Sequence, residues 1–121
     1  MKPIAKFIWT VLIMGFLWQH FFGKANGGSD LSQLVKQGAL VVDVRSTGEY
    51  ATGHIAGAIN IPHSMVAREI GHHASARGNP IILYCLSGGR SAAAKKSLHQ
   101  AGYTNVVNAG GLQEIRQELE P

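Results

Sequence analysis

Apolar and amphipathic stretches alternate along the chain from Ser29 to the carboxyl terminus. Four short apolar runs are rich in β-branched residues and therefore predict strands. These runs occupy residues 39–44, 58–61, 80–84 and 104–107. The first run is apolar up to Asp43, which is typical of a strand that is buried on both faces.

Helical spacing of apolar residues fills the intervals between these runs. A first helix is capped by Ser29 or Asp30 and is ended by Gly38. Ser46 and Glu49 have the three-residue offset of a capping box, so a short helix is predicted to begin at Ser46. Three further helices are predicted at residues 64–76, 91–100 and 112–119. Strands separated by helices predict an open α/β domain, with a mainly parallel sheet of four or five strands and helices on both faces.

The first 25 residues have a different pattern. Lys2 and Lys6 precede an apolar stretch at residues 7–18, and a polar, glycine-rich stretch follows from residue 23. This order is typical of a signal peptide that is cleaved after Ala25, and an uncleaved membrane anchor over residues 4–22 is the alternative. In either case an apolar helix precedes the domain, residues 26–30 form a flexible linker and the domain spans residues 31–121. We expect the domain to be exported, either periplasmic or anchored to the inner membrane and facing outward.

Net charge does not indicate a nucleic-acid partner. The chain of 121 residues has a formal charge of +4, but three of its 11 basic residues lie in the first 25 positions. The remainder carries 8 basic and 7 acidic residues, without a basic run interleaved with aromatic residues. We therefore expect no nucleic acid among the partners, contact with a membrane only through an uncleaved amino-terminal segment, and a monomer.

The single cysteine lies in a loop that is suited to anions. Cys85 ends the third predicted strand and is followed by Leu86, Ser87, Gly88, Gly89, Arg90 and Ser91, where a helix begins. Ligands in such sheets bind at the carboxyl ends of the strands. Unpaired backbone N–H groups at the helix start, two glycines that let the loop curl, and the Arg90 guanidinium all favour negative charge there. A thiol in this setting is deprotonated more readily, so Cys85 is the candidate nucleophile.

Several separated motifs resemble those of the rhodanese sulfurtransferases. They are Cys85-x-x-Gly88-x-Arg90-Ser91, Asp43-Val-Arg45, Glu49-Tyr50, Gly53-His-Ile-x-Gly57-Ala-x-Asn60-Ile-Pro62 and Asn108-Ala-Gly-Gly-Leu112. The resemblance covers about residues 39–115. With the leader included, the chain is most similar to the small exported thiosulfate sulfurtransferases of the phage-shock type.

The resemblance implies a reaction and its site. The Cys85 thiolate would take the outer sulfur of thiosulfate or a similar anionic donor, leaving a persulfide, and a thiol, a protein or cyanide would then accept that sulfur. Loop N–H groups from Leu86 to Ser91 and the Arg90 guanidinium would hold the donor. No metal or organic cofactor is required. Asp43 and Arg45 would support the loops, and Arg45 could pair with Glu49.

Three other functions remain open. Dual-specificity phosphatases and arsenate reductases share this fold, but they typically have five residues between the cysteine and the arginine, whereas this chain has four, which favours sulfur transfer. A persulfide carrier or protein-binding module is the runner-up, and a membrane-tethered redox sensor is the third hypothesis.

The histidines and two lysines are not predicted to take part in the chemistry. His54 is predicted to be a hydrogen-bonding scaffold residue. His63, His72, His73 and His99 do not have metal-ligand spacing, so no metal site is predicted. Lys95 and Lys96 are predicted to lie on a solvated helix face.

Overall fold

The computed structural model describes residues 30–121 of the chain. The predicted signal peptide or anchor and most of the predicted linker lie outside these residues. Within them, no helix is long and apolar enough to cross a bilayer.

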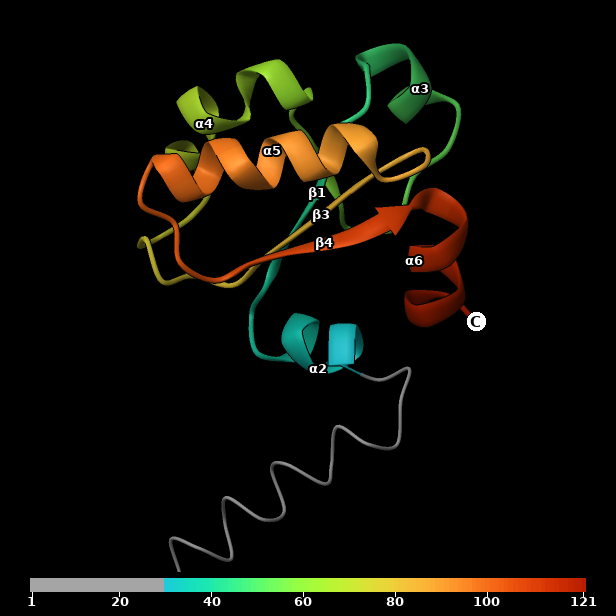
Figure 1. Cartoon of the computed structure of the whole chain (residues 1–121). Helices are drawn as coiled ribbons and strands as arrows, with labels where there is room; N and C mark the ends of the chain where they lie inside the picture. The colour runs from blue at the N-terminus through green and yellow to red at the C-terminus, as the bar shows by residue number, and fades with distance from the viewer. Residues whose placement is uncertain (1–29) are drawn as a thin grey trace, which may run out of the picture. The chain divides into compact units, whose positions relative to one another are not determined.

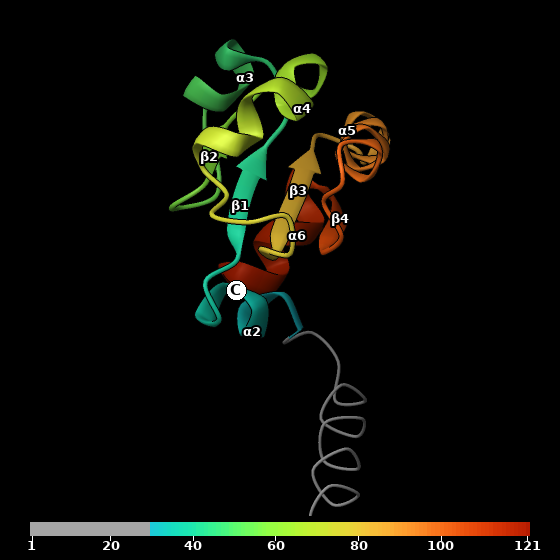
Figure 2. The same cartoon turned by 90° about the vertical axis from the view of Figure 1, so that its left-hand side faces the viewer.

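Four parallel strands form one sheet in the order β2-β1-β3-β4. Their bounds are β1 (Leu40–Asp43), β2 (Ile59–Asn60), β3 (Ile81–Cys85) and β4 (Val106–Gly111). The two central strands, β1 and β3, run side by side in Figure 2 and end at the same edge. The predicted open parallel α/β sheet is confirmed, with four strands.

Helices cover both faces of this sheet (Figure 1). The helices of the domain are α2 (Asp30–Lys36), α3 (Thr47–Ala51), α4 (Val66–Glu69), α5 (Gly89–Gln100) and α6 (Leu112–Leu119), with 3-10 turns η2 (His63–Met65) and η3 (Ile70–His72) on either side of α4. Apolar residues of α4 and α5 pack on one face, and those of α2 and α6 pack on the other.

Side chains of β3 alternate between the two faces, because successive residues of a strand point to opposite sides. Ile81, Leu83 and Cys85 join the cluster under α4 and α5. Ile82 and Tyr84 join the cluster under α2 and α6. The alternation therefore places the thiol on the α5 face of the sheet.

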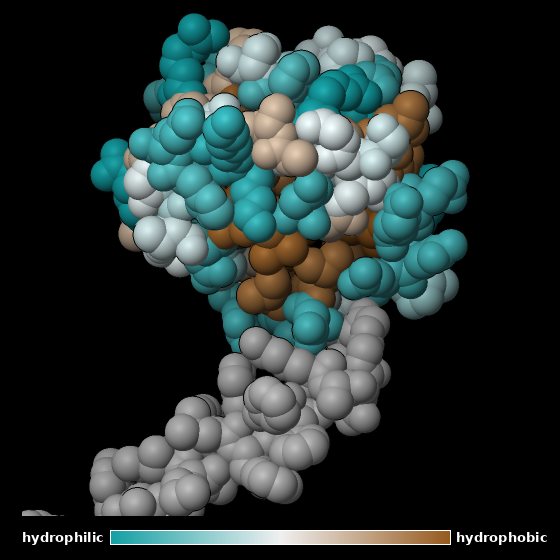
Figure 3. Space-filling model, in the orientation of Figure 1, coloured by the Kyte–Doolittle hydropathy of each residue, from teal (hydrophilic) through white to brown (hydrophobic). Residues whose placement is uncertain are grey.

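The face under α2 and α6 is covered less completely. Leu34, Val107 and Leu119 pack against its buried residues but are themselves only partly buried. Figure 3 shows apolar surface between β4 and α2 on the visible face.

Several predicted elements differ from the observed ones. The helix expected at residues 91–100 begins two residues earlier, at Gly89, and the strands expected at residues 39–44 and 80–84 are Leu40–Asp43 and Ile81–Cys85. The helix expected at residues 64–76 is instead η2, α4 and η3, which end at His72. Gly71 lies in this stretch, and glycine weakens a helix interior. The strand expected at residues 104–107 is shifted to Val106–Gly111, because pairing with β3 outweighs the poor strand propensity of its asparagine and glycines. The strand expected at residues 58–61 keeps only Ile59–Asn60, at the edge of the sheet.

The short helix α3 forms as its capping box predicts. The Ser46 hydroxyl accepts a hydrogen bond from the backbone N–H of Glu49, and the Glu49 carboxylate accepts one from the backbone N–H of Ser46. These bonds satisfy N–H groups that a helix start leaves unpaired. They also fix the Glu49 side chain beside the loop that follows β3.

Candidate active site

Cys85 lies at the carboxyl end of β3, directly before the loop that leads into α5. Asp43 lies at the same end of the neighbouring strand β1, and Asn108 lies in β4 on the other side. Strand order and direction therefore bring together residues that are far apart in sequence. The site is at the edge of the sheet where ligands of parallel α/β domains bind.

The backbone of the loop curls around the Cys85 sulfur. Gly88 has φ of +107°, a left-handed conformation that a residue with a side chain adopts only with strain. In this conformation the Gly88 N–H donates a hydrogen bond to Cys85 Sγ over 2.9 Å. The predicted curl of the loop is therefore formed around the thiol.

The surroundings of the thiol favour its ionised form. Cys85 is 1% exposed, and burial raises its pKa. Hydrogen bonding to the Ser91 hydroxyl, whose oxygen lies 3.4 Å from the sulfur, and to the backbone N–H groups of Ser91, Gly88 and Ser87 lowers the pKa. The hydrogen bonds outweigh burial, so the pKa of Cys85 lies below its ordinary value. A thiolate at this position is a nucleophile.

The Arg90 guanidinium forms an ion pair with the Glu49 carboxylate. Its Nη1 and Nη2 donate to the two carboxylate oxygens over 2.7 and 3.0 Å. Both side chains are about one-third exposed, at 34% and 32%. The pair joins α3 to the start of α5, so the positive charge predicted for an anion is already partly balanced by a carboxylate.

Arg45 and Asp43 form a second ion pair, which is buried beneath the loops. The Arg45 guanidinium donates to both carboxylate oxygens, with its shortest contact at 2.7 Å, and also to the carbonyl oxygen of Gly53. The hydrogen bond to Asp43 outweighs desolvation and raises the pKa of Arg45. The prediction that Arg45 pairs with Glu49 is wrong, because its side chain turns inward to Asp43 while Glu49 reaches α5.

The remaining predicted loop residues differ in exposure. Leu86, Ser87 and Gly89 are exposed, and Ser91 is fully buried. Leu86 is 56% exposed. The loop therefore presents main-chain N–H groups and the Ser91 hydroxyl to the sulfur, and one large apolar side chain to its surroundings.

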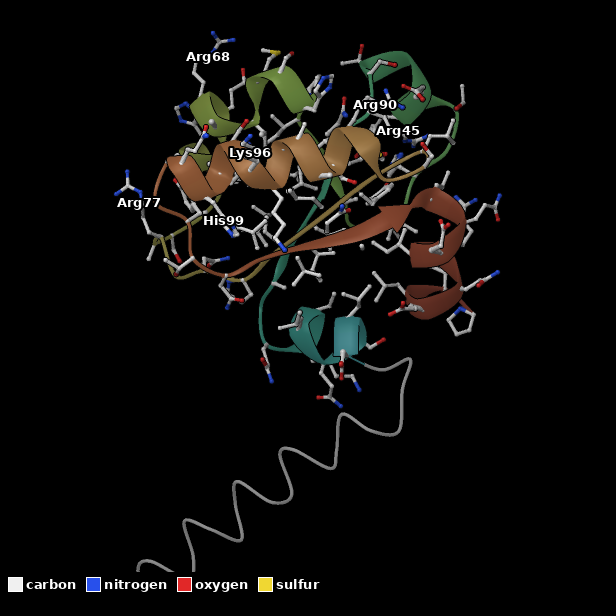
Figure 4. The ribbon with its side chains drawn as sticks, viewed as in Figure 1. Arg45, Arg68, Arg77, Arg90, Lys96 and His99 are labelled. Atoms are coloured by element: carbon white, nitrogen blue, oxygen red, sulfur yellow. The ribbon has the colours of Figure 1, made fainter. Side chains whose placement is uncertain are left out.

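Four arginines lie at opposite ends of the layer formed by α4 and α5. Figure 4 shows Arg45 and Arg90 together beside α3, whereas Arg68 and Arg77 lie at the other end of α4 and α5.

His54 stacks on Tyr50 at a centroid distance of 3.6 Å, and its Nδ1 lies 2.9 Å from the Tyr50 carbonyl oxygen. His54 thus has the scaffold position that its motif predicts.

Asn108 was not predicted as a site residue, although it stands in one of the quoted motifs. Its Oδ1 accepts a hydrogen bond from the Ser91 hydroxyl over 2.7 Å. The sequence signal was a polar side chain directly after the end of the fourth predicted strand, two residues before a pair of glycines. Its contact depends on strand order, which local pattern does not reveal.

Gly111 is where β4 approaches the active-site loop. A Cβ at this position would overlap the carbonyl oxygen of Leu86 and lie 2.6 Å from Glu114 Oε2. We expect Gly111→Ala to lower the free energy of unfolding by about 1–3 kcal/mol, because the loop backbone must move. Urea denaturation measures this loss. Gly48→Ala, in α3 with no atom within 4 Å of the added Cβ, is the matched control and should be neutral or stabilising. Equal stability of the two variants would contradict this packing.

The Glu49–Arg90 pair predicts part of the acid sensitivity. Hydrogen bonds from Arg90 and from the Ser46 backbone lower the pKa of Glu49 from 4.5 to about 2. Because the folded-state pKa is depressed, the stabilisation is complete above about pH 4.5 and is lost as pH falls toward about 2. We expect wild type to lose more stability than Glu49→Gln across this range, measured by urea denaturation at each pH. Glu118→Gln, at an exposed position of α6, is the control. Parallel acid profiles for wild type and Glu49→Gln would refute the prediction.

Comparison with known proteins identifies relatives of this domain. Residues 28–118 match the rhodanese-like domain family. The thiosulfate sulfurtransferase PspE of Escherichia coli is 40% identical over 74 residues, which cover 61% of this chain and 71% of that protein. The thiosulfate sulfurtransferase GlpE of Pseudomonas fluorescens is 34% identical over 88 residues, which cover 73% of this chain and 79% of that protein.

Solved structures agree with the sequence relatives. A structure described as rhodanese with anions from E. coli has a TM-score of 0.61 and 38% identity, covering 63% of this chain and 89% of that chain. The human single-domain sulfurtransferase TSTD1 has a TM-score of 0.63 and 29% identity, covering 74% and 91%. The family that the motifs predicted is confirmed: this chain belongs to the rhodanese-like domain family.

Proposed function

We propose that this protein is a sulfurtransferase in which Cys85 carries sulfane sulfur from thiosulfate, or a similar small anionic donor, to a thiol or cyanide acceptor. The Cys85 thiolate attacks the outer sulfur of the donor, and the sulfur–sulfur bond of thiosulfate breaks as sulfite leaves with its electron pair. A nucleophilic acceptor then attacks the outer sulfur of the persulfide. This step forms thiocyanate when the acceptor is cyanide, and it releases the Cys85 thiolate.

One observation carries the proposal: the Cys85 sulfur accepts a hydrogen bond from the Gly88 N–H inside a loop whose hydrogen bonds lower the pKa of the thiol. The same donors that stabilise a thiolate suit a leaving thiolate in the second half of the reaction. The relatives named thiosulfate sulfurtransferase support the choice of donor.

The donor's oxyanion is held chiefly by the loop backbone in this proposal. Residues 86–91 supply main-chain N–H groups around the sulfur. Arg90 already donates to Glu49, but each of its terminal nitrogens has a second N–H. Arg90 can therefore contact a sulfonate without breaking the ion pair, and Asp43 and Arg45 act only by holding the loops.

Steady-state turnover tests the function. Purified full-length protein is expected to form thiocyanate from thiosulfate and cyanide, with a rate that depends on both substrates. Kinetics in which the two substrates react in turn, with sulfite released before cyanide reacts, are the signature of a covalent intermediate. Absence of thiocyanate and of sulfite release would defeat the proposal.

A persulfide carrier that serves a partner protein is the second candidate. The 56% exposure of Leu86 beside the thiol favours it, because exposed apolar groups commonly contact protein partners. Slow turnover with cyanide together with fast sulfur transfer to a protein thiol would favour the carrier. Comparable rates with both acceptors would favour the enzyme.

Export remains a proposal that rests on the leader pattern alone. We place the monomeric domain outside the cytoplasm, either released after cleavage at Ala25 or tethered through residues 4–22. Cell fractionation followed by intact mass of the recovered protein distinguishes the two forms. Recovery of uncleaved protein in the cytoplasm would exclude both.

A further inference from the structure

The hydroxyl of Ser91 has three acceptors within reach and one proton to give. Asn108 Oδ1 lies 2.7 Å from Ser91 Oγ, the Gly88 carbonyl oxygen 3.0 Å and the Cys85 sulfur 3.4 Å. Ser91 is fully buried at the start of α5. A direct hydrogen bond to the sulfur therefore competes with the bonds to the two oxygens.

The Asn108 amide is oriented so that its oxygen faces Ser91. The Gly110 N–H donates to Asn108 Oδ1 over 2.9 Å, and Asn108 Nδ2 donates to the Gly88 carbonyl oxygen over 3.4 Å. Both contacts require Asn108 Oδ1 to face the Gly110 N–H and Asn108 Nδ2 to face the Gly88 carbonyl oxygen. β4 thus presents an acceptor to the hydroxyl that neighbours the nucleophile.

We propose that Asn108 is a positioning residue, whose Oδ1 competes with the Cys85 sulfur for the proton of the Ser91 hydroxyl. In the thiol form, the S–H donates to Ser91 Oγ and the serine O–H donates to Asn108. When the thiol proton leaves to water, the serine O–H turns to the thiolate, and Asn108 Oδ1 keeps the Gly110 N–H. Ser91 retains its own proton in both states, and only the direction of its hydrogen bond changes.

The competition sets how much the thiolate is stabilised by Ser91. A hydrogen bond from the Ser91 hydroxyl to the sulfur stabilises the thiolate, but it forms only when the hydroxyl breaks its hydrogen bond to Asn108. Asn108 therefore moderates the pKa of Cys85 without being placed to donate to the sulfur itself. Its importance for catalysis rests on the proposed sulfurtransferase function, whereas the exchange of hydrogen bonds does not.

Charged groups around the thiol are balanced and do not involve Asn108. The Arg90–Glu49 pair flanks the site from α5 and α3, and the Asp43–Arg45 pair lies at the end of β1. β4 contributes no ionisable side chain, and His63 of η2 is exposed. An uncharged substitution at Asn108 therefore changes the hydrogen bonding of Ser91 while leaving these charges in place.

Titration of the thiol tests the proposal directly, because Cys85 is the only cysteine in the chain. The pKa is measured on the full-length protein from the pH dependence of alkylation by iodoacetamide. We expect Asn108→Leu, which has a similar shape and no acceptor, to lower the pKa of Cys85 by about one unit. We expect Ser91→Ala to raise the pKa by about the same amount. An unchanged or raised pKa in Asn108→Leu would overturn the proposal, because a merely structural role would loosen the loop and weaken the donors.

A double-mutant cycle isolates the competition. In the Ser91→Ala background, Asn108→Leu is expected to leave the pKa unchanged, because the contested proton is gone. If Asn108→Leu does not fold, Asn108→Asp replaces it. The carboxylate introduced by Asn108→Asp is then expected to raise the pKa of Cys85 more when Ser91 is present than in the Ser91→Ala background. Only a protein with Ser91 has a hydroxyl proton for which the carboxylate and the sulfur compete. Equal shifts in the two backgrounds would overturn the proposal. These titrations need no turnover, so their failure is distinguishable from failure of the sulfurtransferase function.

Discussion

Cys85→Ser is expected to lower thiocyanate formation by at least about a thousandfold, because it removes the atom that carries the transferred sulfur in the proposed reaction. A serine hydroxyl at this position has a pKa far above that of a thiol and does not form a persulfide. Gly88 and Ser91 still offer hydrogen bonds to the new oxygen, so the loop should remain closed. The measurement is the initial rate with thiosulfate and cyanide at saturating concentrations.

The control for this variant is its stability. Cys85→Ser should unfold in urea near the wild-type midpoint, so a lost rate is chemical rather than structural. A variant that kept about a tenth of the wild-type rate would show that sulfur does not pass through Cys85.

Of the substitutions considered, Asp43→Ala is expected to lower the free energy of unfolding most. The carboxylate is fully buried and accepts the Arg45 side-chain bonds as well as the Arg45 backbone N–H. Its removal leaves a buried guanidinium without a counter-charge, which costs about 3–5 kcal/mol in the free energy of unfolding. Urea denaturation of wild type and variant measures the difference.

Two comparisons separate this mechanism from a general effect of losing a charge. The double variant Asp43→Leu/Arg45→Met should recover part of the loss, because no charge is then left buried. Glu49→Gln disrupts a pair that is one-third exposed and should cost about 1 kcal/mol or less near neutral pH. A loss of the same size in Asp43→Ala and Glu49→Gln would argue against a special role for the buried pair.

Local pattern predicted most of the fold. β-branched runs marked all four strands, and glycine and capping residues marked the ends of α2 and α3. The pattern did not locate the breaks in the segment from His63 to His72, because its apolar residues fit one continuous helix as well as three short turns. It also placed β4 at residues 104–107 rather than at Val106–Gly111. The second half of that strand is stabilised by pairing with β3 rather than by its own strand propensity.

The site was predictable where its residues are consecutive. The loop from Cys85 to Ser91 follows from one stretch of sequence, and its glycine at Gly88 has the left-handed conformation that the curl requires. Partners across the fold were not predictable in the same way. Arg90 binds Glu49 from 41 residues away, and Ser91 binds Asn108 from 17 residues away. Such contacts depend on strand order and on which way each side chain turns, so the pairing of Arg45 was wrongly assigned.

Intact mass spectrometry after incubation with thiosulfate tests the role of Cys85 most directly. The full-length protein is treated with excess thiosulfate, separated from it and weighed under non-reducing conditions. A gain of about 32 Da, reversed by cyanide and absent in Cys85→Ser, is the predicted result for a single persulfide. An unchanged mass in the wild type, or the same gain in Cys85→Ser, would contradict sulfur transfer through this residue.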